Sequence, residues 1–275
     1  MTIYVSKALA EKFPKIASLI CYHAMTNGIE YRELDSGNLW ARDYMPVKTK
    51  GDYTKFQYKG YDGFPQLEVK EECWDWIDPY WSDIVLDGGN VEQNDTTVLM
   101  TEQVFKNNPN ILRKELGQFL KDIFGKKIIF LPVEPGDELG HIDGIARFID
   151  EKTVFINDYG TEWPEYSRKL ERILEYNCIK FIRMPWGYSK MPKITETEFR
   201  IRYPYADDYN PAAGYYINYL ETPDMIFLPS FGFEPEDMES VKIIKQHFPD
   251  REVVQIECLD LSMHGGVLNC ITWCD

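Results

Sequence analysis

Short apolar runs and amphipathic segments alternate along this chain in a repeated order. The first example lies within the opening residues, as a short strand pattern at 2–6, apolar residues every three or four positions at 9–23, and a second strand pattern at 29–34. Spacings of three and four place side chains on one face of a helix, whereas a short apolar run is typical of a buried strand. The pattern therefore predicts a strand–helix–strand unit over residues 2–34.

The same order recurs three times further along the chain, in units of roughly 50 residues. These units span 86–132, 140–185 and 213–256, and a fourth opening, at His264-Gly265-Gly266, leads to Cys270. Repeated units of this size are typical of modules arranged around an axis. Together with the N-terminal unit, which is shortened at its start, they predict about five modules in an α/β fold.

Two segments depart from the repeat. Residues 47–82 are polar and aromatic with several turn residues, which predicts an irregular hairpin and a lid-like loop for substrate recognition. Residues 187–211 are an insertion before the last full unit. Because modules around an axis bring their openings together, we expect the polar residues at these openings to share one cavity. Those residues are Asp43, Asp87, His141, Asp143, Asn218 and Cys270.

Charge and composition narrow the classes of partner. The 275 residues carry a net charge of −15, which argues against nucleic acid and anionic membranes and suits a cationic small molecule or peptide. The six cysteines form no CxxC pair or zinc-spaced cluster, which predicts a reduced compartment and no metal site. The opening residues lack the pattern of a signal peptide, and no run of about 18 apolar residues occurs. We therefore expect a cytoplasmic protein that does not span a membrane.

The candidate chemistry centres on Cys270. A thiolate behind a glycine pair is a candidate nucleophile, because the glycines let the backbone approach a bound group. For a lone cysteine, the alternative is a small apolar residue in a buried strand. His141 is a candidate for moving protons, and the other groups are carboxylates, which stabilise a cation. A planar, cationic carbon with N–H groups that match paired carboxylates is the carbon of a guanidinium.

Asp43 has two interpretations at this point. Its neighbour Arg42 favours an ordinary surface ion pair. Its other neighbours, Trp40, Tyr44 and Pro46, favour a carboxylate that faces a pocket with aromatic walls.

Several motifs, in order along the chain, resemble those of the agmatine deiminase and bacterial-type peptidylarginine deiminase family. They are Trp40-x-Arg42-Asp43-x-x-Pro46, Leu86-Asp87-Gly88-Gly89-Asn90, Gly140-His141-Ile142-Asp143-Gly144-x-x-Arg147-Phe148, Phe248-Pro249-Asp250-Arg251-Glu252-Val253-Val254 and Gly265-Gly266-x-x-x-Cys270-Ile271-Thr272. The resemblance covers about residue 30 to the end. It implies a five-bladed α/β propeller of the guanidine-modifying superfamily, formed as one domain over residues 1–275 and working without a cofactor.

The resemblance also implies a role for each candidate residue. Cys270 resembles the nucleophile and His141 the general acid and base, and Asp87 is an acidic residue near the histidine. Asp43 and Asp143 resemble the pair that holds the guanidinium nitrogens, with Asn218, Trp40 and Arg42 as further substrate-binding residues. The expected reaction is attack of the Cys270 thiolate on the guanidinium carbon, loss of ammonia, and hydrolysis of a covalent thiouronium intermediate.

Two positions differ from the family pattern. Agmatine deiminases carry an asparagine and a histidine where this chain has Val267 and Asn269, a difference that bears on the substrate more than on the reaction. Three functions stay open: a deiminase of agmatine, free arginine or peptidyl arginine; an amidinotransferase; and a propeller that binds an arginine-containing ligand without turnover. The expected partner is a small cationic guanidine or an arginine side chain. The oligomeric state is open, a homodimer included.

Overall fold

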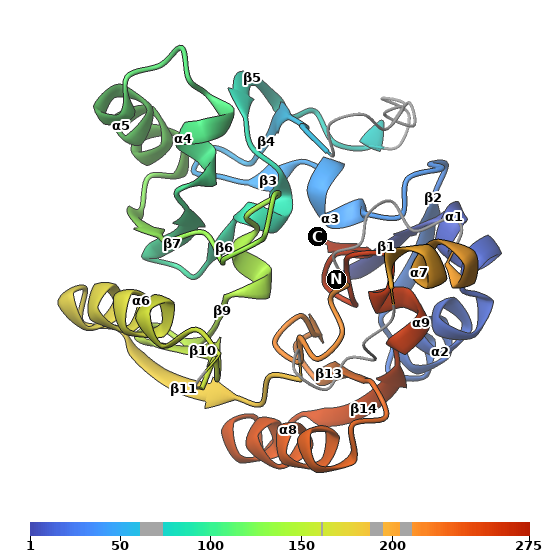
Figure 1. Cartoon of the computed structure of the whole chain (residues 1–275). Helices are drawn as coiled ribbons and strands as arrows, with labels where there is room; N and C mark the ends of the chain where they lie inside the picture. The colour runs from blue at the N-terminus through green and yellow to red at the C-terminus, as the bar shows by residue number, and fades with distance from the viewer. Residues whose placement is uncertain (61–73, 161, 188–194, 204–210) are drawn as a thin grey trace. The chain divides into compact units, whose positions relative to one another are not determined.

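The strands of the chain are grouped in small sheets, seen in a computed structural model that describes residues 1–60, 74–160, 162–187, 195–203 and 211–275 (Figure 1). Within these residues there are five sheets, and each has three strands. In order across each sheet, they are β15 (Thr272–Cys274), β1 (Thr2–Ser6) and β2 (Glu30–Leu34); β3 (Val47–Lys48), β4 (Tyr53–Gln57) and β5 (Tyr80–Val85); β6 (Glu92–Gln93), β7 (Thr97–Thr101) and β8 (Lys127–Leu131); β9 (Ala146–Asp150), β10 (Thr153–Asn157) and β11 (Lys180–Met184); and β12 (Leu220–Glu221), β13 (Met225–Ser230) and β14 (Glu252–Glu257).

Most of the sheets share one pairing rule. The middle strand pairs antiparallel with the first strand and parallel with the third, as in β6-β7-β8 and β12-β13-β14. A parallel pair needs a long crossover, and helices of the described residues supply it between β1 and β2, between β7 and β8, and between β13 and β14. The helices of the described residues are α1 (Lys7–Lys12), α2 (Pro14–Thr26), α3 (Ala41–Tyr44), α4 (Gln103–Asn107), α5 (Arg113–Phe124), α6 (Pro164–Tyr176), α7 (Glu196–Arg202), α8 (Glu234–His247) and α9 (Leu259–Ser262).

The C-terminal strand completes the first sheet. β15 pairs antiparallel with β1, with Val5 opposite Thr272 and Ile3 opposite Cys274. The sequence predicts a first module shortened at its start and a separate fourth opening at residues 264–266. The N-terminal segment does lack the first strand of its module, and that strand comes from the other end of the chain, so only the separate fourth opening is corrected. Cys270 therefore lies two residues before a strand that is fixed in a sheet.

Residues 47–82 contain a sheet, which corrects the expectation of an irregular hairpin with a lid. β3, β4 and β5 follow the same pairing rule as the other modules. The expected lid-like loop falls partly at residues 61–73, outside the described residues. The predicted number of five modules is right, although this segment and not the fourth opening supplies one of them.

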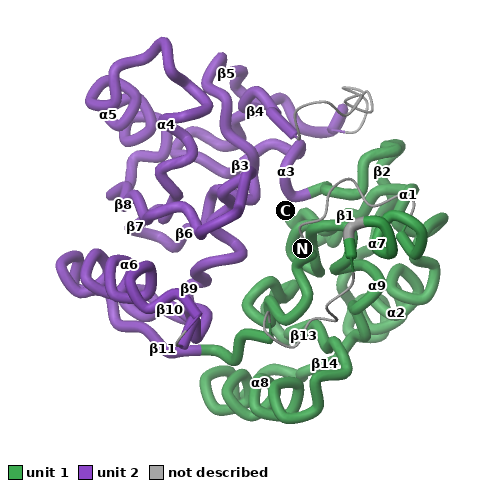
Figure 2. Tube along the Cα trace, viewed as in Figure 1, with its two compact units in different colours: residues 1–41, 67–70, 184–275 green, residues 42–66, 71–183 purple. Residues whose placement is uncertain are grey.

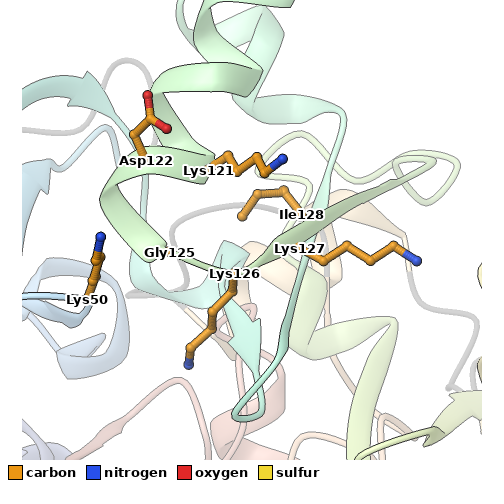
Figure 3. A pocket seen from close by; sticks show the side chains of 7 residues that line it. All are labelled: Lys50, Lys121, Asp122, Gly125, Lys126, Lys127 and Ile128. Atoms are coloured by element: carbon orange, nitrogen blue, oxygen red, sulfur yellow. The ribbon is translucent and has the colours of Figure 1, made fainter.

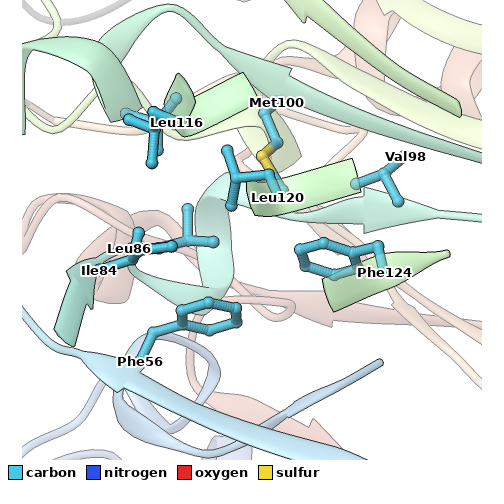
Figure 4. Close-up of a cluster of buried hydrophobic side chains, with 9 residues drawn as sticks. Phe56, Ile84, Leu86, Val98, Met100, Leu116, Leu120 and Phe124 are labelled. Carbon is cyan, nitrogen blue, oxygen red and sulfur yellow. The ribbon is translucent and has the colours of Figure 1, made fainter. Parts of the chain in front are cut away.

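A cluster of buried side chains holds the second and third sheets together. Phe56 and Phe124 stack with ring centroids 6.0 Å apart, and Leu86 packs in the same cluster (Figure 4). The cluster includes Phe56, Ile84, Leu86, Val98, Met100, Val104, Leu116, Leu120 and Phe124, each less than 8% exposed. Burying apolar area at this density fixes neighbouring backbone as well as side chains. Leu86 directly precedes Asp87, so the packing of Leu86 in the core fixes the backbone position of Asp87.

The described residues fall into two compact units (Figure 2). Unit 1 lies within 1–41 and 184–275 and holds the first and last sheets, whereas unit 2 lies within 42–60 and 74–183 and holds the other three. The single domain over 1–275 stays a prediction. Among the described helices, none has both the length and the apolar character that crossing a membrane requires.

Candidate functional site

Unit 2 gathers four of the predicted site residues. Asp43 lies in α3, Asp87 precedes the short 3₁₀ helix η2 (Gly88–Asn90), and His141 precedes the 3₁₀ helix η3 (Ile142–Gly144), which contains Asp143. All four side chains are buried, with exposed fractions of 2% to 9%. Buried carboxylates are costly unless charged or hydrogen-bonding groups compensate them. Their partners therefore define what the site can do.

The imidazole of His141 lies between two carboxylates. Its Nε2 is 3.2 Å from Oδ2 of Asp87, and its Nδ1 is 3.6 Å from Oδ1 of Asp43. Both ring nitrogens of a histidine donate only when the ring is the charged imidazolium. A carboxylate on each side therefore favours the protonated form.

Backbone N–H groups also donate to both of these carboxylates, to the oxygen of Asp43 that faces His141 and to the second oxygen of Asp87. Gly89 N donates to Oδ1 of Asp43 at 2.9 Å, and Lys59 N donates to Oδ1 of Asp87 at 2.8 Å. Such bonds to charged oxygens are stronger than neutral ones and fix the direction of each carboxylate. Asp87 thus accepts from a backbone N–H on one oxygen and contacts His141 with the other.

The two residues after Asp87 must be glycines because other groups of the site lie too close to their backbone to leave room for a side chain. A Cβ on Gly88 would lie 2.0 Å from the carbonyl oxygen of Arg42, and a Cβ on Gly89 would lie 2.5 Å from Oδ1 of Asp43 and 2.7 Å from Nδ1 of His141. Real Cβ atoms do not approach other heavy atoms this closely. The motif Asp87-Gly88-Gly89 therefore lets α3 and the histidine pack directly onto its backbone.

Burial and mutual charge shift the pKa values of this cluster. Burial alone lowers the pKa of His141, but Asp43, Asp87 and Asp143 outweigh it and raise that pKa from 6.5 to about 10. Burial, together with the charges of Asp87 and Asp143, raises the pKa of Asp43 from 3.8 to about 7, although the His141 cation and Gly89 N–H oppose the shift. At neutral pH His141 is therefore an imidazolium, which is a proton donor.

A buried lysine, not predicted from the sequence, lies close to the same cluster. Burial lowers the pKa of Lys55 to about 8, against the charge of Asp87, which raises it. Its Nζ donates to the carbonyl of Phe56 at 2.8 Å and lies 5.3 Å from the centre of the Trp74 ring. The sequence gives no local sign that Lys55 is buried, because it is a polar residue in a strand and its aromatic partner Trp74 lies nineteen positions away.

Unit 1 holds the predicted nucleophile in a tight turn. Cys270 is 8% exposed, and Ile271 N bonds to the carbonyl of Val267 at 3.3 Å in the turn that leads to β15. Asn218 precedes β12, is 3% exposed, and contacts this turn through Oδ1, which lies 3.4 Å from Cys270 Sγ. The structure thus brings Asn218 to the cysteine.

Two further candidates have packing contacts. Trp40 is 8% exposed and lies against Gly266, where a Cβ would come within 2.4 Å of its ring. The absence of a side chain at Gly266 is therefore explained by Trp40, whereas the sequence suggests space for a bound group. In unit 2, Arg42 is partly exposed, and its carbonyl approaches Gly88. Substrate contacts of Trp40 and Arg42 stay predictions.

A cavity of about 740 Å³ lies elsewhere in unit 2, at the end of α5 (Figure 3). It is lined by Lys50, Lys121, Asp122, Gly125, Lys126, Lys127 and Ile128, and none of the predicted site residues is among them. The lysine ammonium groups point in different directions, and that of Lys126 donates to Gln93 and to the carbonyl of Asn94. These lysines do not converge on a single ligand position.

Comparisons with known proteins show what the chain is similar to. The profile of the family described as Porphyromonas-type peptidyl-arginine deiminase matches residues 1–274. The agmatine deiminase of Pseudomonas syringae pv. syringae is 27% identical over 279 residues, covering 87% of this chain and 75% of that protein. The structure of the agmatine deiminase of Enterococcus faecalis aligns with a TM-score of 0.76 at 19% identity, covering 99% of this chain and 92% of that one. DDAH from Pseudomonas aeruginosa, in complex with citrulline, aligns with a TM-score of 0.57 at 10% identity, covering 98% and 97%. The predicted five-module α/β fold is confirmed.

The pKa of His141 predicts how stability depends on pH. Because the folded chain holds this proton more tightly than the unfolded chain, its stabilisation is complete below pH 6.5 and is lost as the pH rises through about 10. Between pH 8 and 9.5, the free energy of unfolding of the wild type should fall by roughly 1 kcal/mol per pH unit from this group. In Asp87→Asn the pKa of His141 is lower, so the decline should be smaller. Urea unfolding of both proteins between pH 8 and 9.5 measures this decline in the free energy of unfolding. An equal decline in the wild type and in Asp87→Asn would contradict a His141 charge stabilised by Asp87.

Proposed function

The chain belongs to the Porphyromonas-type peptidyl-arginine deiminase family, and from this premise we propose that it converts agmatine to N-carbamoylputrescine and ammonia with Cys270 as nucleophile. The members of this family are hydrolases that cleave a guanidino C–N bond, and the resemblance read from the sequence motifs is confirmed. The observation that carries the proposal is the imidazole of His141 held between Asp43 and Asp87.

In the first half of the proposed reaction, the Cys270 thiolate adds its electron pair to the guanidinium carbon and forms a C–S bond. The C–N bond to one terminal nitrogen then breaks, and the departing amine takes the proton of the His141 imidazolium and leaves as ammonia. A pKa of His141 near 10 places that proton on the ring before the substrate arrives. The product of this half is a thiouronium bound to Cys270, with His141 neutral.

In the second half, neutral His141 takes a proton from water, and the resulting hydroxide attacks the thiouronium carbon. The C–S bond breaks and the thiolate is released, the O–H proton of the adduct passes to solvent, and the ureido product leaves with His141 protonated again. Asp43 and Asp143 have the charge and burial suited to binding the guanidinium nitrogens during both halves.

Support for agmatine comes from two sources. The relative from Pseudomonas syringae and the neighbour from Enterococcus faecalis are named agmatine deiminases. The net charge of −15 also suits a small dication. Val267 and Asn269 lie beside the nucleophile and differ from the family pattern, so arginine and peptidyl arginine are the competing substrates.

A substrate panel tests the proposal. The protein is incubated with agmatine, free arginine and a peptidyl arginine, each with and without an added amine, and ammonia and ureido products are measured. We expect equal amounts of ammonia and N-carbamoylputrescine from agmatine, with turnover lowered on the order of 10³ or more in Cys270→Ser. Turnover of a peptidyl arginine alone would reject agmatine. An amidino group on the added amine would indicate transfer, and no product from any guanidine would contradict deimination.

A second prediction concerns Gly89. In Gly89→Ala the new Cβ displaces Asp43 or His141, so kcat on agmatine should fall on the order of 10² while the protein stays folded. The matched control is Gly51→Ala, because no atom lies within 4 Å of the Cβ there, and its rate should be unchanged. Steady-state kinetics of both variants measures this effect. Equal rates in the two would show that the contact at Gly89 does not position the pair.

A further inference from the structure

The side chain of Asn218 contacts the nucleophile itself. Its Oδ1 accepts a hydrogen bond from Asn269 N at 3.1 Å, and it lies 3.4 Å from both Cys270 N and Cys270 Sγ. The carbonyl oxygen of Asn218 also accepts from Asn269 N at 3.1 Å. One buried side chain thus reaches the backbone and the sulfur of the residue expected to attack.

These contacts determine which end of the carboxamide faces the cysteine. Oxygen and nitrogen of an asparagine are distinguished by their partners, and the N–H groups of Asn269 and Cys270 can only donate. The oxygen must therefore face them, and it faces the sulfur as well. An oxygen in this place accepts a hydrogen bond from the S–H of a thiol, whereas its lone pairs repel a thiolate.

Asn218 is itself held in place. The backbone N–H of Asn218 donates to the carbonyl of Tyr215 at 3.1 Å, and its neighbours Ile217 and Tyr219 are fully buried. On the other side of the contact, the turn carrying Cys270 continues into Thr272, whose hydroxyl donates to the carbonyl of Leu268 at 2.8 Å. Neither partner can move away without disturbing packed residues.

We propose that Asn218 is a positioning residue that holds Cys270 in its protonated thiol form until a substrate binds. This inference rests on the proposed function, and it differs from the role of substrate contact expected from the sequence. Hydrogen bonding to the neutral form of a group disfavours the charged form. The resting thiol must then lose its proton to solvent before attack, so the thiolate forms at the cost of the contact with Asn218.

The experiment follows alkylation of Cys270 by iodoacetamide against pH, without substrate, with the modified peptide quantified by mass spectrometry. In Asn218→Ala the S–H loses its acceptor, so the pH midpoint should move down and the rate below the midpoint should rise by about tenfold. Asn218→Asp keeps an acceptor for the two N–H groups and adds a negative charge, so its midpoint should move up. The control Asn177→Ala removes an amide that bonds to Ile173 in α6, and its midpoint should match the wild type.

The two variants move in opposite directions only if Oδ1 acts on the sulfur. If the midpoint is unchanged in both, or falls in Asn218→Asp, the proposal is overturned, and a higher KM with an unchanged midpoint would assign Asn218 to substrate binding. Should Asn218→Ala not fold, Asn218→Leu takes its place, because it fills the same space without an acceptor, and its midpoint should also move down. Because alkylation needs no substrate, its outcome is independent of whether agmatine is turned over.

Discussion

The contact on which the site depends is the one between the His141 imidazole and the carboxylates of Asp43 and Asp87. Three carboxylates and a histidine are buried together, and they are tolerable only if one positive charge and several N–H donors compensate them. The imidazolium supplies the charge, and Gly89 N supplies one of the donors. Gly89 follows from this constraint, because a Cβ there would push Asp43 and His141 apart, whereas Gly88 is required by the close approach of the Arg42 carbonyl.

The cysteine half of the chemistry depends on a different constraint, the position of a turn. Cys270 lies between Gly266, which packs against Trp40, and β15, which closes the first sheet. The same turn contacts Asn218. A nucleophile close to the C-terminus is therefore fixed by a sheet and by a buried amide, although a chain end by itself is usually poorly ordered.

The sequence predicted the parts of the fold that have a local signal. The strand predicted at residues 2–6 is β1. The helices predicted from apolar spacing near residues 112–123 and 235–248 are α5 and α8, which begin and end within a few residues of the predicted bounds. The sheet at residues 47–85 was missed because β3 is two residues long and the strands beside it mix polar with aromatic residues. The pairing of β15 with β1 was missed because it joins the two ends of the chain.

The candidate site shows the same division. Repeated glycine-marked openings indicated Asp87, His141 and Cys270, and unit 2 does gather the first two within hydrogen-bonding distance. The contact of Asn218 with the sulfur, like the burial of Lys55, depends on residues distant in sequence, and no spacing rule predicts it.

The protonation state of His141 in the resting protein tests the account most directly. Nitrogen-15 NMR distinguishes an imidazolium, with both ring nitrogens protonated, from a neutral ring, and His141→Gln assigns the signal among the four histidines. The account predicts an imidazolium at pH 8 that titrates near pH 10. A neutral His141 at pH 8, with an ordinary histidine titration, would contradict it.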